Sequence, residues 1–433
     1  MPMPTPTPTP TRDGAKRTFV SSYHFPVCNY PFLQTSIYPS IPLYTPLYPS
    51  VHIFFSNNPR IAMTSSNLFR PLKLGNVELQ NRIALAPLTR FRADDSHVPL
   101  PFVQDYYAQR GSVPGTLLIT EATFIAPRAG GMGNAPGIWS EEQITAWKDV
   151  TKAVHAKGSF IYLQLWALGR AAFAENLKKE LGPDAKVQSA GDIPFEGGAT
   201  PTPLTETEIK EYIELYAQAA KNAISAGFDG VEIHAANGYL IDQFTQDVSN
   251  NRTDAWGGSV EKRARFGIEV TKAVVDAVGA DKTGIRLSPY STFQGMKMKD
   301  PVPQFTYLAT ELKKFKLAYV HLVESRISGN ADVEPTERVD FLIDLWDNQS
   351  PVLLAGGFKA NSAKTAADEE YKDKNVLIVF GRYFISNPDL VFRVQKDIEF
   401  TPYDRNKFYN KGEKDGYITW PFSKEFEAQA SKL

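Results

Sequence analysis

The chain has 433 residues, of which 42% are hydrophobic, and this length fits one large catalytic domain together with an extension. Its 47 Lys and Arg against 48 Asp and Glu leave a net charge of −1, so no field of one sign would attract nucleic acid or an anionic membrane. The only cysteine is Cys28, which excludes an intrachain disulfide, and no run of about 18 apolar residues indicates a membrane span. We therefore expect a cytoplasmic monomer or homodimer whose partner is a small molecule.

The first 62 residues differ in composition from the rest of the chain. They begin with a low-complexity, proline-rich tract from Met1 to Pro10, and no acidic residue occurs between Asp13 and Glu78. This segment fits either a transit peptide or a start codon placed too early, with Met63 as the real beginning. Few arginines and many prolines favour the second interpretation. In both cases we expect residues 1–62 to be a disordered extension without a catalytic role, and residues 63–433 to form the catalytic domain.

From Leu72 onward, segments of strand-like and helix-like character alternate. Residues Leu72 to Leu79 alternate between apolar and polar around Gly75 and Asn76, which predicts a β-hairpin. Eight short runs rich in Val, Ile, Leu and Phe follow this hairpin. We predict a strand at each of them: 82–86, 116–120, 160–165, 230–233, 284–287, 319–322, 352–354 and 376–380.

Helical patterns lie between the predicted strands, and several carry clear start signals. Ser140-Glu-Glu-Gln143 and Thr205-Glu-Thr-Glu208 are capping boxes before apolar residues at helical spacing, and Ser259 can cap a third helix. Eight strand–helix units close naturally into a (β/α)8 barrel, the TIM barrel, with the hairpin as an N-terminal cap. A doubly wound open sheet is the alternative. Against it, the first strand is not followed by Gly-x-Gly-x-x-Gly, and the sequence has no Gly-x-x-x-x-Gly-Lys-Ser/Thr.

In such a barrel the catalytic groups lie at the carboxyl ends of the strands. Two neutral hydrogen-bond donors, His234 and Asn237, follow the fourth predicted strand and can converge on one oxygen atom, as a site that polarises a carbonyl requires. Tyr239 comes two residues later and can offer a proton to the same ligand. We expect His321, on the sixth strand, to be a barrel residue without chemistry, and His155, near a helix end, to lie at the surface.

The residues after the fourth strand also carry a resemblance to a known family. His234-Ala-Ala-Asn237-Gly-Tyr239-Leu-Ile-Asp-Gln-Phe244 resembles the signature of the old yellow enzyme family of flavin-dependent ene-reductases, and Asn251-Arg-Thr-Asp254-Ala-Trp-Gly257-Gly258-Ser259 follows at the family's spacing. The resemblance covers residues 68–422. Segments such as Phe91-Arg-Ala-Asp94 and Ile138-Trp-Ser-Glu141 are similar to fungal members, in particular to the chanoclavine aldehyde reductase/isomerase branch of ergot-alkaloid pathways.

This resemblance implies a bound flavin mononucleotide (FMN), NADPH or NADH as the reductant, and no metal. The glycine turns and Arg382 suit the phosphate, Arg286 and Gln164 suit the pyrimidine edge, and Thr89 suits the reacting face. Many family members carry Gly at the position of Ala122, where a backbone contact tolerates one extra methyl group. The implied flavin-binding residues are Pro87, Leu88, Thr89, Ala122, Gln164, Arg286, Gly356, Gly357, Gly381 and Arg382.

The resemblance further implies a two-step hydride relay that reduces the C=C bond of an α,β-unsaturated carbonyl compound, an enone or enal. His234 and Asn237 would hold the carbonyl oxygen, and Tyr239 would protonate the α-carbon after hydride reaches the β-carbon. We expect the loop 169–205 to cover the substrate pocket. The aromatic residues expected to wall that pocket are Trp166, Tyr290, Phe293, Phe408 and Tyr409.

Two other functions stay open at this point. One is an FMN-dependent isomerase of an unsaturated aldehyde in fungal secondary metabolism, without net turnover of NADPH. Tyr239 at the proton-donor position favours reduction over isomerisation. The other is a barrel that has lost its chemistry or binds another phosphate ligand, and the presence of Thr89, His234 and Asn237 argues against it.

Overall fold

The structure of this protein, a computed structural model, describes residues 66–325, 327–328, 331–332 and 337–432. This part of the chain contains the whole of the predicted hairpin and all eight predicted barrel strands. The expected disorder of residues 1–62 and the start of the catalytic domain at residue 63 concern a segment outside the described residues, and both stay predictions.

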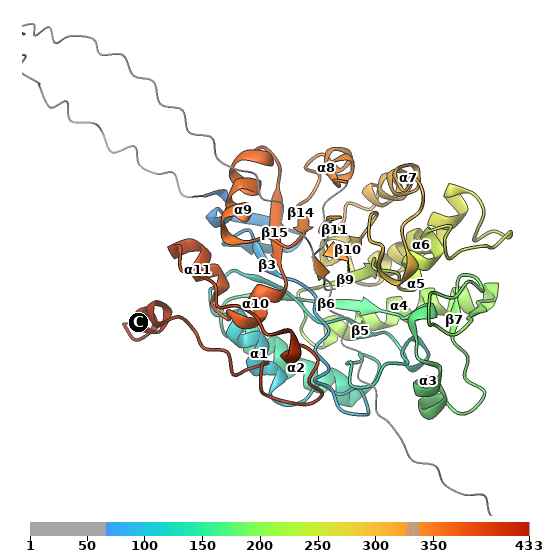
Figure 1. The fold of residues 1–433 in the computed structure, drawn as a ribbon, viewed down its shortest axis with the longest axis horizontal. Coiled ribbons are helices and arrows are strands. Elements are labelled where there is room, and N and C mark those ends of the chain that lie inside the picture. The colour runs from blue at the N-terminus through green and yellow to red at the C-terminus, as the bar shows by residue number, and fades with distance from the viewer. Residues whose placement is uncertain (1–65, 326, 329–330, 333–336, 433) are drawn as a thin grey trace, which may run out of the picture. The chain divides into compact units, whose positions relative to one another are not determined.

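Eight parallel strands form a closed barrel (Figure 1). They follow one another around the barrel in chain order, and β15 pairs with β3 to close the ring. A short strand, β5 (Thr123–Phe124), continues the line of β4 and pairs with β6. The predicted (β/α)8 barrel is confirmed, since each predicted strand overlaps one of these: β3 (Ile83–Leu85), β4 (Leu117–Ile119), β6 (Phe160–Trp166), β9 (Gly230–Ala235), β10 (Thr283–Leu287), β11 (Tyr319–Val323), β14 (Val352–Ala355) and β15 (Val376–Phe380).

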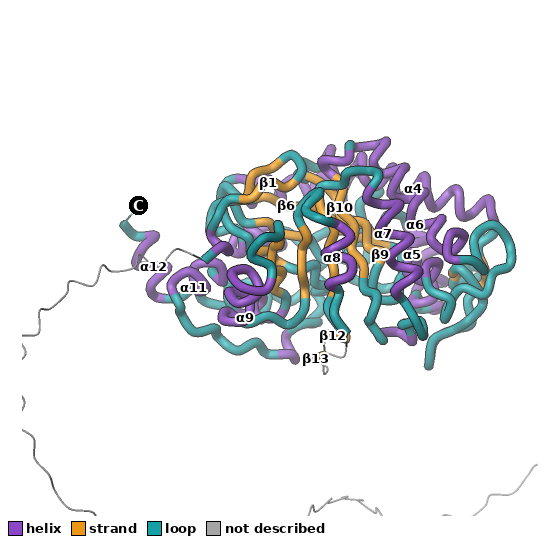
Figure 2. Tube along the Cα trace, turned by 90° about the horizontal axis from the view of Figure 1, so that it is seen from above, coloured by secondary structure: helices purple, strands orange, loops and turns teal. Residues whose placement is uncertain are grey.

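Helices surround the strands, and every crossover between neighbouring strands carries at least one (Figures 1 and 2). The crossover helices cover the outer face of the barrel, and three further helices follow β15. Their bounds are α1 (Val103–Arg110), α2 (Glu141–His155), α3 (Ala174–Leu181), α4 (Glu206–Ser225), α5 (Leu240–Thr245), α6 (Val260–Val278), α7 (Val302–Lys313), α8 (Asp340–Trp346), α9 (Ala360–Thr365), α10 (Arg382–Ser386), α11 (Leu390–Lys396) and α12 (Lys424–Ala430).

The three predicted helix starts are present. Ser140 and Thr205 each accept a hydrogen bond from the backbone N–H three residues on, and the side chains at those positions, Gln143 and Glu208, accept from the cap backbone in return. Ser259 Oγ accepts from the backbone N–H of residue 262 at the start of α6. These bonds satisfy amide groups that a helix start otherwise leaves unpaired.

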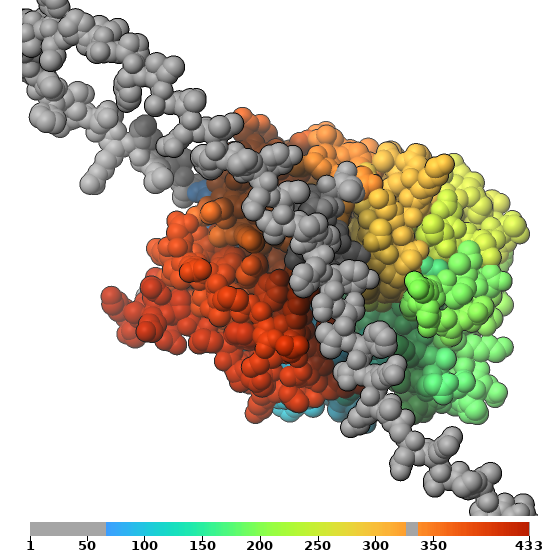
Figure 3. Space-filling view, in the orientation of Figure 1, coloured from blue at the N-terminus to red at the C-terminus, as the bar shows by residue number. Residues whose placement is uncertain are grey.

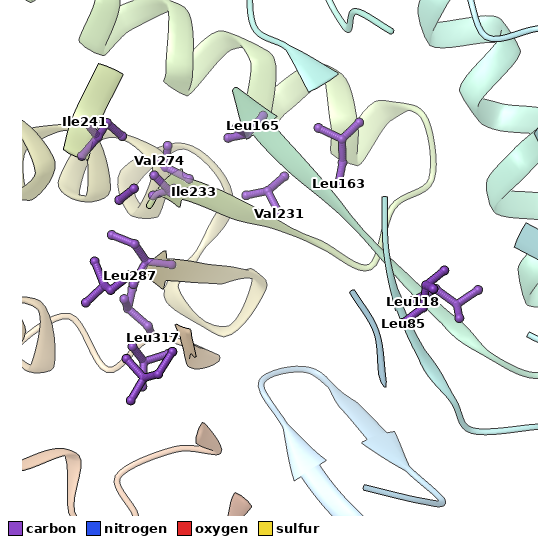
Figure 4. Packing of buried hydrophobic residues seen from close by; sticks show 14 of the residues in the cluster. Leu85, Leu118, Leu163, Leu165, Val231, Ile233, Ile241, Val274, Leu287 and Leu317 are labelled. Atoms are coloured by element: carbon purple, nitrogen blue, oxygen red, sulfur yellow. The ribbon is translucent and has the colours of Figure 1, made fainter. Parts of the chain in front are cut away.

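The main hydrophobic core lies between the barrel and its helices. Along each strand, alternate residues point outward, so Leu163 and Leu165 of β6, and Val231 and Ile233 of β9, belong to one buried cluster with residues of the covering helices. Figure 4 shows these side chains, with Ile241 of α5 and Val274 of α6 among their neighbours in that cluster. The intervening residues, which include Gln164, Glu232 and His234, point into the barrel.

The N-terminal hairpin closes one end of the barrel, as predicted. Its strands β1 (Leu72–Leu74) and β2 (Val77–Leu79) bury four apolar side chains in the same cluster as the inward-facing Tyr162 and Tyr319. The turn fits closely, because the Asn76 N–H donates to the Asp281 carbonyl over 3.1 Å. In Figure 2 the hairpin lies at one end of the strands, whereas β12 (Ile327–Ser328) and β13 (Ala331–Asp332), which follow the carboxyl end of β11, lie at the other.

Two glycines make room for large rings inside the barrel. A Cβ atom on Gly230 would lie 2.2 Å from the Tyr162 ring, and one on Gly284 would lie 2.3 Å from the Tyr319 ring. Neither separation is possible between unbonded atoms. The absence of a side chain at these positions therefore lets both tyrosines lie across the neighbouring strand.

Within the described ranges, no helix combines the length and the apolar character that crossing a bilayer requires. The same residues contain no cluster of three or more His, Cys, Asp or Glu side chains arranged to hold a metal ion. The cytoplasmic location and the monomeric or dimeric state stay predictions.

Replacement of Gly284 by Ala should destabilise the barrel. The new methyl group must displace the Tyr319 ring, and overpacking of this kind costs about 1–3 kcal/mol. Gly133→Ala is the matched control, because a Cβ atom there meets nothing within 4 Å. Urea denaturation followed by circular dichroism should give a clearly lower midpoint for Gly284→Ala and an unchanged one for Gly133→Ala. Equal midpoints for the two variants would contradict this account of the interior.

Candidate active site

One cavity lies at the carboxyl ends of the barrel strands. This cavity of about 640 Å³ is lined by residues at or after the end of all eight strands, and this volume is typical of small-molecule sites. Of the residues predicted from the sequence, the lining includes Pro87, Leu88, Thr89, Ala122, Gln164, Trp166, His234, Asn237, Tyr239, Arg286, Phe293, Gly356, Gly357, Gly381, Arg382, Phe408 and Tyr409. The structure therefore brings these residues together in one place.

One predicted pocket residue lies elsewhere. Tyr290 does not line the cavity; it is 9% exposed, and its ring packs against Phe341 of α8 with centroids 6.1 Å apart. In the described part of the chain the Tyr290 ring belongs to the main hydrophobic core, and its expected role in the wall of the pocket stays a prediction.

The loop 169–205 does not cover the cavity either, since none of its residues lines it. The buried Arg170 guanidinium instead donates to the Ile193 carbonyl within the loop over 3.0 Å, and to the Gln294 carbonyl after β10 over 2.9 Å, which joins the two segments. Phe195 packs against the cluster that contains Trp166. The loop therefore supports the wall of the cavity from behind.

His234 is a neutral donor. It lies on β9 with 3% of its surface exposed, and it is the direct neighbour of Arg286 on β10. Burial, followed by the charge of Arg286, lowers the pKa of His234 well below its ordinary value. Within the described part of the chain, its Nδ1 is buried and has no hydrogen-bond partner. This imidazole therefore stays uncharged at neutral pH and has bonding capacity left for a ligand.

Asn237 adopts a conformation that few residues accept. Its φ of +58° lies in the left-handed region, which Asn tolerates better than most side chains. The backbone N–H donates to Ser288 Oγ over 2.7 Å, which joins the loop after β9 to the loop after β10. The Asn237 side chain lines the same cavity as His234.

Tyr239 lines the same cavity and lies beside His234. Its ring meets those of Trp166 and His234 edge-on, with centroid separations of 4.9 Å in each case. Burial raises the pKa of Tyr239 to about 12. The hydroxyl therefore keeps its proton at neutral pH and is a suitable proton donor.

Two buried side chains of α5 fix the loop between Asn237 and Tyr239. Asp242 Oδ2 accepts from the Gly238 N–H over 2.8 Å, and Gln243 Nε2 donates to the Gly238 carbonyl over 2.7 Å. Burial raises the pKa of Asp242 to about 7. The sequence analysis passed over this pair, although both residues stand in the quoted motif.

The floor of the cavity carries a cation. Arg286 is 9% exposed, and its Nε is a buried group with no hydrogen-bond partner among the described residues. Gln164, on β6, lines the same cavity, and its Nε2 donates to Glu232 over 2.7 Å. A free buried donor on a cation is costly unless a ligand accepts from it, so this floor suits an anionic or carbonyl-rich ring edge.

Another part of the cavity lining consists of glycine backbone and an arginine side chain. Gly356 and Gly357 follow β14, and the φ of +68° at Gly357 favours glycine. Gly381 and Arg382 follow β15, and the Arg382 guanidinium lies 5.3 Å from the centre of the Tyr403 ring. Glycine turns beside an arginine are well suited to a phosphate group.

The C-terminal segment supplies the aromatic side of the cavity. This segment, orange to red in Figure 3, forms one side of the face that is drawn. Buried Arg90 and Arg92 hold it, since both guanidinium groups donate to the Phe408 carbonyl, over 2.9 and 3.0 Å. Neighbouring lining residues that the sequence analysis missed are Phe91, Met132, Phe358, Lys359, Tyr383 and Tyr403.

Comparisons with known proteins agree with this geometry. Residues 67–400 match the NADH:flavin oxidoreductase / NADH oxidase family. Chanoclavine-I aldehyde reductase fgaOx3 of Penicillium roqueforti is 62% identical, covering 84% of this chain and 98% of that protein. The probable inactive dehydrogenase easA of Claviceps purpurea is 50% identical, covering 86% and 99%. The crystal structure of Old Yellow Enzyme from Pichia sp. superposes with a TM-score of 0.76 at 40% identity, covering 83% and 94%.

The chain belongs to the NADH:flavin oxidoreductase family. It is an oxidoreductase of the old yellow enzyme type, a group that uses FMN together with NADPH or NADH. The cavity fits this cofactor: the unpaired Arg286 donor suits the pyrimidine edge, and the glycine turns beside Arg382 suit the phosphate.

Two histidines should titrate on opposite sides of the ordinary imidazole pKa of 6.5. The hydrogen bond from His155 to Asp229, 3.0 Å long, raises the pKa of His155, whereas burial lowers that of His234. In an NMR titration from about pH 8 downward, His155 should protonate first, and His234 should still be neutral at about pH 6. The pair His155–Asp229 should stabilise the fold at low pH and lose this effect as the pH rises through the folded pKa.

His155→Gln and His234→Gln assign the two signals. A His234 signal that titrates above the ordinary value would contradict the neutral donor described here.

Proposed function

We propose that this protein is an FMN-dependent ene-reductase that uses NADPH or NADH to reduce the C=C bond of α,β-unsaturated carbonyl compounds. The observation that carries the proposal is the shared cavity: two neutral donors and a protonated tyrosine face the same space as the residues suited to FMN.

In this proposal His234 and Asn237 bind the carbonyl oxygen of the substrate. Both are uncharged donors, so they bind neutral substrate without a counterion and bind more strongly as negative charge grows on the oxygen. That polarisation makes the β-carbon electrophilic. The loop bonds from Asp242 and Gln243 hold these donors in place, and positioning of this kind supplies much of the rate advantage.

When bound, FMN supplies the redox chemistry, as acceptor of hydride from the nicotinamide and donor of hydride to the alkene. Pro87, Leu88, Thr89 and Ala122 would contact the ring system, and Arg286 with Gln164 the pyrimidine edge. Gly356, Gly357, Gly381 and Arg382 would hold the phosphate. Tyr239, which its raised pKa keeps protonated at neutral pH, would deliver the proton to the α-carbon.

The names of the relatives differ on whether the protein is an active enzyme. One is named an aldehyde reductase and another a probable inactive dehydrogenase. Because this chain keeps His234, Asn237 and a protonated Tyr239 at the cavity, we infer an active reductase and favour an unsaturated aldehyde or enone as its substrate. An isomerase would use the same oxygen-binding pair without net consumption of NADPH.

Tyr239→Phe tests this proposal, because the change keeps the ring and removes only the acidic hydroxyl. Stopped-flow absorbance should show flavin reduction by NADPH at a near-normal rate. Reoxidation by a weakly activated enone should slow by about 10²–10⁴-fold, the usual share of general acid catalysis. Nitroalkenes should be affected less, since their reduced anion is stable without immediate protonation.

Tyr307→Phe is the control, since this tyrosine of α7 lies outside the cavity. Equal slowing of both half-reactions in Tyr239→Phe would indicate a structural role. Normal rates in both would assign the proton to another donor.

A further inference from the structure

A buried carboxylate lies beneath the cavity and takes no part in the steps above. Glu232 is on β9, two residues before His234, so both side chains point into the barrel. Glu232 is completely buried and does not line the cavity. An ionisable group in such a place is costly unless its partners stabilise one charge state.

Three donors surround this carboxylate. Gln164 Nε2 donates to Oε1 over 2.7 Å, and the Tyr319 hydroxyl and His321 Nδ1 donate to Oε2 over 3.1 and 2.8 Å. Gly284 makes the second of these bonds possible by leaving space for the Tyr319 ring. The carboxylate thus links strands β6, β9 and β11.

These partners keep Glu232 ionised. Burial alone would raise the pKa of Glu232, but the hydrogen bond from His321, the charge of Arg286 and the hydrogen bond from Gln164 outweigh it and hold the pKa below its ordinary value. Burial also lowers the pKa of His321, so that imidazole is a neutral donor. The charged groups that face one another here are therefore one anion, Glu232, and one cation, Arg286.

The ionised carboxylate also orients Gln164. A carboxylate only accepts hydrogen bonds, so the amide nitrogen of Gln164 must face Glu232. The amide oxygen is then directed away from Glu232, and Gln164 lines the cavity. Without Glu232, either end of the amide could face the ligand.

We propose that Glu232 is a positioning residue that fixes the Gln164 amide and lowers the reduction potential of bound FMN by offsetting the positive field of Arg286. This inference rests on the proposed function, since it requires FMN above Arg286. Reduced FMN is anionic at its pyrimidine edge, so a cation beneath it favours reduction and a nearby anion opposes it. By keeping the potential lower, Glu232 would make hydride transfer to the alkene more favourable.

The direct test is the reduction potential of Glu232→Gln, measured by equilibration with a reference dye. This substitution removes the charge and nearly preserves the shape. At the solution potential at which half of the wild-type flavin is reduced, the ratio of reduced to oxidised flavin in the variant should be at least tenfold higher than in wild type. For a two-electron couple this corresponds to about +30 mV. Tyr319→Phe is the matched control, because it removes one donor to Glu232 but leaves the charge, and its ratio should stay within twofold of wild type.

A second comparison applies if Glu232→Gln does not fold, since removal of one partner strands the other charge in the interior. At alkaline pH, where Glu232 stays ionised without Arg286, Arg286→Gln and the double variant Glu232→Gln/Arg286→Gln differ only in the Glu232 charge. The double variant should again have the higher potential by at least the same tenfold ratio. Equal potentials within this pair would overturn the proposal.

The outcomes separate this inference from the proposed function. Wild-type protein that holds no FMN, or that holds FMN and reduces no enone, would refute the proposed function. Wild-type protein that reduces enones, together with a Glu232→Gln potential equal to that of wild type, would refute only the role of Glu232. Equal shifts in Glu232→Gln and Tyr319→Phe would also refute it, because the charge would not be the cause.

Discussion

The pairing of β15 with β3 closes the ring of parallel strands, and the active site depends on this closure. Because all eight strands run in the same direction, closure brings their carboxyl ends to one rim. Residues as distant in the chain as Thr89, His234 and Arg382 thereby line one cavity. The hairpin at the other end buries four apolar side chains against the inward-facing Tyr162 and Tyr319.

Burial then sets the protonation states on which the chemistry depends. It keeps His234 neutral and Tyr239 protonated by disfavouring the charged form of each. Glu232 is the exception, because Arg286 and three hydrogen bonds stabilise its charge against burial. The cavity thus has uncharged donors in His234 and Tyr239, with the cation Arg286 in its lining and the anion Glu232 buried beneath it.

Much of this arrangement could be predicted from the sequence, because its signals are local. Short apolar runs predicted the strands, and the capping residues Ser140 and Thr205 predicted the starts of two helices. The location of the site residues could be predicted because the parallel strands of a barrel bring their carboxyl ends to one rim. Other features depend on tertiary contacts: the Tyr290 ring packs against Phe341, and the loop 169–205 packs behind Trp166. Glu232 was passed over because its hydrogen-bond partners come from β6 and β11, two strands that only the folded barrel brings to β9.

The central claim is that this protein consumes a reduced nicotinamide to saturate a C=C bond. The most direct measurement is the number of NADPH molecules oxidised per molecule of product, under anaerobic conditions, with a cyclic enone and an unsaturated aldehyde as substrates. The account predicts one NADPH oxidised for each saturated product formed. Conversion of the aldehyde to an isomer without loss of NADPH would contradict it, as would NADPH oxidation that leaves both substrates unchanged.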